Sequence, residues 1–136
     1  MIKESGTLTK PQLFNLFRNK LGLADGILHI TLTRNNTLLT LTDPTGDVLT
    51  WTTCKNCGFI GSQKSTEMAT VTTTEEMGNR IHDLKLKNIY IIFHGGARFR
   101  NAALRGLRRA AIPIGGLIIE STTPYNGCRL KKKRRI

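Results

Sequence analysis

Five arginines lie within twelve positions of the stretch RFRNAALRGLRR, which begins at residue 98. The guanidinium group of arginine pairs with phosphate through two parallel hydrogen bonds and stacks on nucleic-acid bases. Two glycines precede the stretch, so we expect a strand-to-helix turn whose exposed N–H groups also favour phosphate. The alternative is a solvated helix face without a ligand. The candidate phosphate ligands are Arg98, Arg100, Arg105, Arg108 and Arg109.

Two polar loops could add hydrogen bonds to the same kind of ligand. The first reads TRNNT (residues 33–37) and offers amide side chains beside Arg34, within reach of phosphate or sugar oxygens. The second reads GSQKST (residues 61–66) and carries one lysine, Lys64. It lacks the glycine spacing of a phosphate loop, so nucleotide hydrolysis is not supported. Taken alone, each segment is an ordinary turn or loop.

A Cys-x-x-Cys pair, Cys54 and Cys57, could supply half of a zinc site or a redox pair. A complete zinc site needs two more ligands, and no matching pair follows. The zinc-deaminase pattern is absent as well, because no His-x-Glu precedes the cysteines. We therefore expect free thiols, no metal and no cofactor, which is typical of a reducing compartment. A metal site completed by a neighbouring chain is the alternative. The other available ligands are Cys128, His29, His82 and His94.

Catalytic chemistry is not predicted. The nine acidic residues are scattered, and only Glu75 and Glu76 are adjacent, so no carboxylate cluster for two-metal chemistry is visible. His94 ends an apolar run, a position where catalytic residues occur, but it has no serine, cysteine or aspartate at an informative spacing. We expect a binding protein and not an enzyme.

The charge of the chain is divided unevenly. Residues 1–83 carry eight Lys or Arg and eight Asp or Glu, whereas residues 84–136 carry thirteen Lys or Arg and a single acid, Glu120. The whole formal net charge of +12 therefore lies in the last two-fifths of the chain. Such asymmetry within one domain indicates a polyanionic partner, above all nucleic acid.

Membranes and export are not indicated. No apolar run approaches the ~20 residues that a membrane span needs. The first ten residues, MIKESGTLTK, lack the apolar core of a secretory signal and the composition of a transit peptide. We expect a chain that works where it is made, or one whose targeting segment has been removed.

The elements that would position these residues alternate between sheet and helix. Residues 9–22 predict a short amphipathic helix, and period-two alternation over 27–33, 37–43 and 47–53 predicts a three-stranded antiparallel meander. A helix follows, capped by Ser65 or Thr66 and reaching about residue 84. Residues 88–94 predict a strand covered on both faces, because the run is almost wholly apolar.

A second helix over about residues 100–110 and a last strand over 115–121 complete the series. The order β-β-β-α-β-α-β predicts an α/β fold with a mixed sheet of about five strands and helices packed on it. We divide the chain into an N-terminal extension (1–24), an α/β RNA-binding domain (25–121) and an extended basic tail (122–136).

Three segments of the chain resemble the universal small-subunit ribosomal protein eleven family, in its bacterial and organellar form. They read NNTLLTLTD (35–43), GFIGSQKST (58–66) and PYNGCRLKKKRRI (124–136). The family patterns are close to N-N-T-x-x-x-x-T-D, G-F-x-G-x-x-K-S-T, and N-G-C-R followed by a basic tail. The resemblance runs from about residue 25 to residue 136.

The resemblance implies a ribonuclease-H-like fold without catalytic carboxylates. It also implies a structural protein bound to small-subunit ribosomal RNA on the platform, beside neighbouring ribosomal proteins and near the exit side of the messenger RNA path. By position it adds RNA-facing residues in both loops and the tail, and Lys55 is a further basic candidate. Those residues are Asn35, Asn36, Thr37, Gly58, Gly61, Ser62, Lys64, Ser65, Thr66, Asn126, Gly127, Cys128, Arg129, Lys131, Lys132, Lys133, Arg134 and Arg135.

The chain also departs from the family pattern. The family has G-P-G-x-G-R where this chain reads GGARFR (95–100), so Arg100 matches while Arg98 and Phe99 are additions. Cys54 and Cys57 replace small residues, and the N-terminal 24 residues lack the usual basic extension. Divergence with the motifs retained suggests an organellar ribosome, most plainly a mitochondrial one, with a plastid or bacterial ribosome as the alternative.

The tail would leave the fold at the YNGC turn and carry six cations in eight residues into a crevice of folded RNA. Each phosphate it neutralises releases counterions, and we expect the tail to order on binding. Loops suited to irregular shapes, and no groove-reading helix motif, favour RNA over DNA. A free-standing RNA-binding regulator remains an alternative, and a nuclease of the same fold is disfavoured by the lack of clustered acids.

Overall fold

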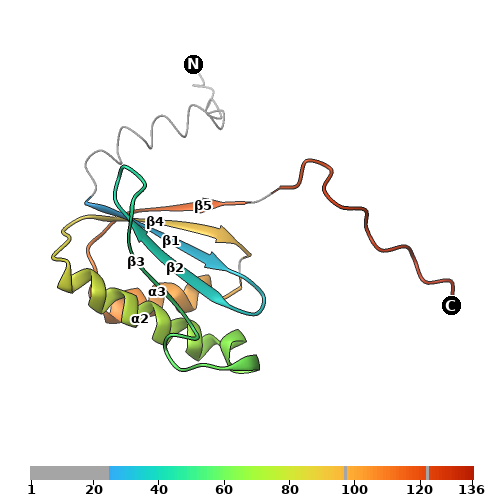
Figure 1. Cartoon of the computed structure of the whole chain (residues 1–136), viewed down its shortest axis with the longest axis horizontal. Helices are drawn as coiled ribbons and strands as arrows, with labels where there is room; N and C mark the ends of the chain where they lie inside the picture. Colours follow the sequence, from blue (N-terminus) through green and yellow to red (C-terminus); the bar gives the residue numbers. More distant parts are fainter. Residues whose placement is uncertain (1–24, 97, 122) are drawn as a thin grey trace, which may run out of the picture.

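The computed structural model describes residues 25–96, 98–121 and 123–136. The helix predicted over residues 9–22 lies outside the described residues. The described part forms one mixed five-stranded sheet with helices against it, as Figure 1 shows, so the predicted fold class is confirmed.

The predicted order of elements is confirmed, with boundaries that differ by one or two residues at most of the elements. One element was not predicted: the 3-10 helix η1 forms inside the segment that we expected to be a loop. The elements are β1 (Gly26–Leu32), β2 (Thr37–Thr42), β3 (Val48–Thr53), η1 (Gly61–Ser65), α2 (Glu67–Asp83), β4 (Ile89–Gly95), α3 (Arg100–Arg109) and β5 (Ile114–Glu120).

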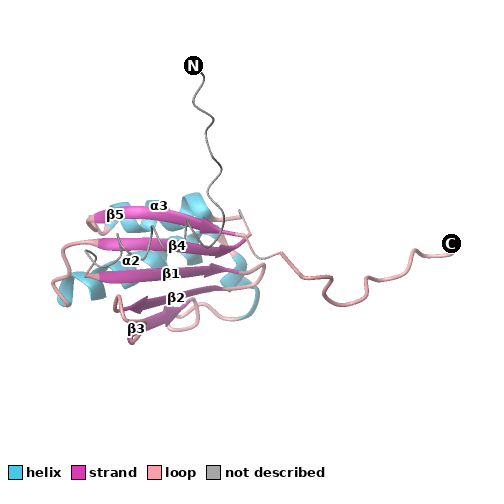
Figure 2. Cartoon of the chain, turned by 90° about the horizontal axis from the view of Figure 1, so that it is seen from above, coloured by secondary structure: helices cyan, strands magenta, loops and turns pink. Residues whose placement is uncertain are grey.

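The sheet has the strand order β3-β2-β1-β4-β5. The strands β1, β2 and β3 form the predicted antiparallel meander, and β4 and β5 add to β1 in parallel. In Figure 2 the five strands lie side by side, with the helices behind them. Because β1, β3, β4 and β5 run in the same direction, their carboxyl ends meet at one edge of the sheet.

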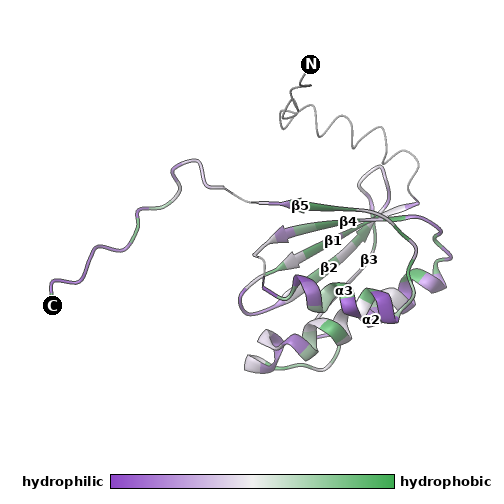
Figure 3. Cartoon of the chain, turned by 180° about the vertical axis from the view of Figure 1, so that it is seen from behind, coloured by the Kyte–Doolittle hydropathy of each residue, from purple (hydrophilic) through white to green (hydrophobic). Residues whose placement is uncertain are grey.

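Both α-helices cover the same face of the sheet (Figure 1), and the core lies between the two layers. Figure 3 shows mostly hydrophobic strands, whereas hydrophilic residues gather on α3 and along the tail. The largest fully buried core side chains from the sheet are Leu28, Ile30, Leu39, Leu41, Ile89, Ile91 and Phe93.

The prediction that residues 88–94 are covered on both faces is wrong for the described residues. In β4 the buried residues alternate with half-buried ones, and the latter are Tyr90, Ile92 and His94. Both helical crossovers lie on the opposite face, so no described element covers these three side chains. We call this side of the sheet the open face.

The helix α2 forms in spite of the run TVTTT, which has low helix propensity. Its cap is the predicted Thr66, whose Oγ1 accepts a hydrogen bond from Ala69 N at 3.3 Å. The hydroxyls of Thr73 and Thr74 are buried and donate to backbone carbonyls one turn earlier, at 2.7 and 2.9 Å. Because the hydroxyls are satisfied inside the helix, these threonines can face the core.

The two helices cross closely because glycine stands at both contact points. A methyl group on Gly106 would lie 2.6 Å from the carbonyl oxygen of Val71 and would clash with Thr74. A methyl group on Gly78 would collide with Ala110. The crossing holds α3 against α2 and so fixes where α3 begins, beside the carboxyl end of β4.

Candidate RNA-binding surface

The predicted phosphate-binding segments come together at one edge of the sheet. The loop 33–36 follows β1, the segment 54–66 follows β3, the turn into α3 follows β4, and the tail follows β5. These are the four strands whose carboxyl ends share an edge, so the loop 33–36 and the chain that leaves β5 after Glu120 start from the same edge although they are far apart in the sequence. Figure 1 shows the β1–β2 loop and the start of the tail on the same side of the molecule. We call this edge the loop edge.

The loop 33–36 is held by its own hydrogen bonds. Thr33 Oγ1 donates to the carbonyl of Asn36 at 2.9 Å, and Asn36 Oδ1 accepts from Thr37 N at 2.9 Å. Thr37 is buried, and its hydroxyl lies 3.0 Å from that of Thr70 in α2. Asn36 and Thr37 therefore shape the loop, while Arg34 and Asn35 are exposed and available to a ligand.

The segment 54–66 is held in a compact conformation by local hydrogen bonds and by two glycines. Ser65 Oγ donates to the carbonyl of Ser62 at 2.7 Å, and Thr66 Oγ1 donates to that of Gln63 at 2.7 Å. Gly58 and Gly61 adopt positive φ angles of 89° and 58°, which favour glycine. The exposed predicted residues here are Lys55, Gly58, Gly61, Ser62 and Thr66, and Lys64 and Ser65 are partly exposed.

The turn into α3 departs from the family pattern at a strained position. Phe99 is the N-cap of α3 and has φ 66°, a left-handed conformation that glycine adopts without cost. The guanidinium of Arg98 lies 4.6 Å above the Phe99 ring. Arg100 Nη2 donates to the carbonyl of Gly95 at 2.9 Å, and its buried Nε has no partner among the described residues. Arg98 and Arg100 thus both lie at the loop edge.

The other arginines of α3 occupy the helical surface away from the loop edge. Leu107 is buried and Leu104 packs against the core. Arg105 forms an ion pair with Glu67, and Arg109 lies 3.9 Å from Glu75, both on α2. Sequence reasoning missed these pairs, because they depend on how the two helices cross. Arg108 is exposed and forms no ion pair within the described part of the chain.

The tail leaves the domain as an extended chain. Asn126 and Gly127 have positive φ angles of 72° and 48°, so the predicted turn is present. Every residue from 123 to 136 is exposed, and Figure 1 shows this segment running away from the sheet. Its six cations form no ion pair with the described residues and are free to meet an anionic partner.

A cluster of titratable side chains on the open face was missed by the sequence reasoning. His29 Nδ1 and His94 Nε2 are 3.1 Å apart, and His94 Nδ1 lies 2.9 Å from Glu120 Oε2. Burial, and then the neighbouring His94, lowers the pKa of His29, while Glu120 acts in the opposite direction. The partners are distant in the sequence, so only the parallel pairing of β1, β4 and β5 reveals the cluster.

The cysteines do not present two thiols to a common ligand. Cys54 is buried, and its Sγ lies 3.5 Å from Thr73 Oγ1, which donates to it. Cys57 is partly exposed and Cys128 is exposed. Among the residues that the structure describes, no three His, Cys, Asp or Glu side chains are gathered to hold a metal ion.

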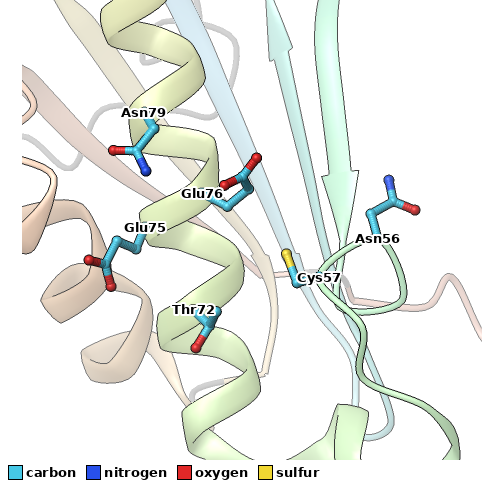
Figure 4. Close-up of a pocket in the computed structure, with 6 residues that line it drawn as sticks. All are labelled: Asn56, Cys57, Thr72, Glu75, Glu76 and Asn79. Carbon is cyan, nitrogen blue, oxygen red and sulfur yellow. The ribbon is translucent and has the colours of Figure 1, made fainter.

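Cys57 lines a pocket of about 420 Å³ between the segment after β3 and α2. Figure 4 shows Cys57 facing the side of α2 that carries Glu76, while Glu75, Thr72 and Asn79 come from the same helix and also line the pocket. Glu76 pairs with Arg80 at 3.3 Å. Carboxylates at this surface disfavour an anionic ligand such as phosphate. In the described ranges, no helix has the length and apolar character to cross a membrane.

Basic loops, a helix start and a cationic tail lie at one edge of an α/β domain, an arrangement that is typical of a protein that binds a polyanion. Among the described residues, no carboxylates are gathered into a cluster that could hold a catalytic metal ion. The comparisons with known proteins identify which kind it is. Residues 26–135 match the model of the family described as ribosomal protein S11. The chain therefore belongs to the ribosomal protein S11 family, whose members are structural and not enzymatic.

Three relatives show how complete the similarity is. The chain is 39% identical over 119 residues to the small ribosomal subunit protein uS11c of Oltmannsiellopsis viridis, covering 88% of this chain and 92% of the relative. It is 40% identical over 119 residues to uS11 of Pseudoalteromonas atlantica, with the same coverage. It is 36% identical over 129 residues to uS11 of Hahella chejuensis, covering 95% of this chain and all of the relative.

Proposed function

We propose that this chain is a structural constituent of the small ribosomal subunit and binds small-subunit ribosomal RNA through the loop edge and the tail. One observation carries the proposal: four segments that are distant in sequence, and that hold exposed cations or amides, project from the same edge. Every relative described above is named as a small ribosomal subunit protein.

The residues proposed to bind RNA differ in their roles. Arg34, Asn35, Lys55, Arg98 and Arg100 stand on the folded domain and meet irregular RNA with a fixed shape. The tail adds charge without a fixed shape, because every residue from 123 to 136 is exposed. Arg105 and Arg109 already have carboxylate partners on α2, so their contribution to RNA binding is smaller.

The finer location follows from the residue-by-residue match to the family motifs. We infer a place on the platform of the small subunit, among neighbouring ribosomal proteins and near the path of messenger RNA. We also infer a mitochondrial ribosome, because the chain departs from the family pattern at residues 95–100 and at Cys54 and Cys57. Recovery of this chain from purified plastid or bacterial ribosomes would contradict the mitochondrial origin.

Sedimentation of native lysate on a sucrose gradient tests the assignment. The full-length chain should migrate with the small subunit at low salt and at moderate salt. A variant that lacks residues 129–136 should fold normally and remain at the top of the gradient. The matched control replaces Lys85 and Lys87, which lie at the opposite edge of the sheet, with glutamine and should migrate like the full chain.

Two outcomes of this experiment would contradict the proposal. Full-length chain at the top of the gradient at every salt concentration would contradict a ribosomal role and favour a free RNA-binding regulator. Unfolding of the truncated variant would show that the tail belongs to the domain, contrary to the division proposed above.

A further inference from the structure

Three titratable side chains form a hydrogen-bonded row across three adjacent strands of the open face. Glu120 ends β5, His94 is the penultimate residue of β4, and His29 lies in the middle of β1. The two imidazole rings are stacked, with centroids 5.4 Å apart and planes inclined by 12°. The tail begins two residues after Glu120, and the carbonyl of Gly95, next to His94, accepts from Arg100. The row therefore lies beside the proposed RNA-binding surface.

The distances determine where the protons are. A carboxylate only accepts hydrogen bonds, so the 2.9 Å contact with Glu120 requires a proton on His94 Nδ1. In a neutral His94, Nε2 is then an acceptor, and the 3.1 Å contact requires His29 Nδ1 to donate. This leaves Nε2 of a neutral His29 without a proton, so it cannot donate to an anion. Nε2 has no hydrogen-bond partner among the described residues.

The surroundings of His29 contain few other charges. On β2 its neighbours are Thr40, directly opposite, and Leu38, two pairs further along the same face, and both are uncharged. On β4 the other titratable group of the open face is Tyr90, and on β5 it is Glu120. No described element packs over this face. Burial lowers the pKa of His29, His94 lowers it further, and Glu120 opposes both. In the chain without RNA, the pKa of His29 is therefore lower than that of a free imidazole side chain.

We propose that the row is a proton-linked phosphate site, in which RNA binding at the loop edge places a phosphate oxygen at His29 Nε2 and draws one proton from solvent onto that nitrogen. The existing hydrogen bonds are unchanged by this step, because Nδ1 of His29 continues to donate to His94. The protonated ring gains an N–H donor and a positive charge, which a phosphate oxygen binds as a charge-assisted hydrogen bond. The inference rests on the proposed function and adds a ligand and a pH dependence to the same surface.

Thermodynamic reciprocity makes the proposal measurable. A ligand that raises the proton affinity of His29 must itself bind more tightly when His29 is protonated. One linked proton changes the affinity by at most about tenfold for each pH unit. We therefore expect the affinity for RNA to decrease by roughly three- to tenfold between pH 6 and pH 8 at constant ionic strength.

The test uses the full-length chain and a transcript of the complete small-subunit ribosomal RNA. Filter binding gives the affinity from pH 6 to pH 8 for the wild type and for His29→Gln, His29→Asn and His94→Gln. The control is His82→Gln, because this third histidine lies at the far end of α2 and bonds to the carbonyl of Ala110. Calorimetry of the wild type in two buffers of different ionisation enthalpy counts the protons without any variant.

The expected result is proton uptake by the wild type and by His82→Gln, and a flat pH profile for the variants of His29. His94→Gln keeps the titrating ring of His29 and should retain a pH-dependent affinity. Proton uptake of zero in the wild type would overturn the inference, as would an unchanged pH profile in a folded His29 variant. RNA binding without proton uptake rejects this inference alone, whereas no binding at any pH rejects the proposed function and this inference with it.

Discussion

Replacing the six tail cations with glutamine should greatly weaken the salt dependence of RNA binding. The residues are Arg129, Lys131, Lys132, Lys133, Arg134 and Arg135, all exposed and without an ion pair to the described residues. Each neutralised phosphate contributes about 0.7 to the slope of log K against log salt for single strands and about 0.9 for duplex DNA. Six contacts therefore contribute about 4 to 5 to the slope, or roughly 10²- to 10³-fold in affinity between 50 and 200 mM salt.

The assay is filter binding of the ribosomal RNA transcript at several potassium chloride concentrations, with the unfolding free energy measured in parallel. The unfolding free energy should change by less than about 0.5 kcal/mol, because all six substituted residues are exposed. Replacement of Lys85 and Lys87 with glutamine is the control, and its slope should match that of the wild type. If the six substitutions left the slope unchanged, the tail would not be the electrostatic anchor and the reasoning would be refuted.

Four further results are expected. Gly106→Ala should lower the unfolding free energy in urea by about 1–3 kcal/mol, because the added methyl group forces α3 away from α2. Phe99→Gly should raise it by about 1 kcal/mol, because glycine removes the strain of φ 66°. Arg100→Gln should weaken RNA binding by about 1–3 kcal/mol, and by more than Arg105→Gln, whose guanidinium is already paired. The unfolding free energy of the free chain should fall as the pH drops below 6.5, since unfolded His29 takes up a proton more readily than folded His29.

Each of these results has a control and a contrary outcome. Asn101→Ala, on the exposed side of α3, is the control for Gly106→Ala and should leave the unfolding free energy unchanged. If Gly106→Ala also left the unfolding free energy unchanged, the two helices would have room to adjust to the added methyl group. A loss of stability in Phe99→Gly would mean that contacts of the ring outweigh the strain. Equal effects of Arg100→Gln and Arg105→Gln would extend the RNA contact along α3. The pH dependence of stability should be smaller in His29→Gln, and an equal dependence would assign it to other groups.

The buried face of the sheet could be predicted because apolar and polar residues alternate along the strands. Leu28, Ile30 and Leu32 recur at every second position and lie in the core. The open face was harder to recognise, since Ile92 and Tyr90 are apolar residues on a half-buried surface. An apolar run of this kind is equally typical of a strand covered on both faces, so composition alone could not distinguish the two arrangements.

The candidate site was predictable in its residue types but not in its pairings. The family motifs and the charge asymmetry indicated the loops, α3 and the tail. The ion pairs of Arg105 and Arg109 depend on the close crossing of α2 and α3, which glycine at 78 and 106 permits. The contact between His29 and His94 depends on parallel pairing across 65 residues. Such long-range register has no local signature in a single sequence.

The geometry of the sheet also suggests different roles in RNA binding for the loop edge and for the tail. The loop edge exists only in the folded domain, because β1, β3, β4 and β5 must pair before their carboxyl ends meet. The tail keeps its charge whether or not the domain has folded, and its long-range attraction acts before contact is made. We therefore expect the tail to govern the rate of encounter and its dependence on salt, and Arg34, Asn35 and Arg100 on fixed supports to govern which RNA shape is accepted. Lengthening the tail with further lysines should then raise the association rate for any RNA, while only changes at the loop edge should alter the preference among RNAs.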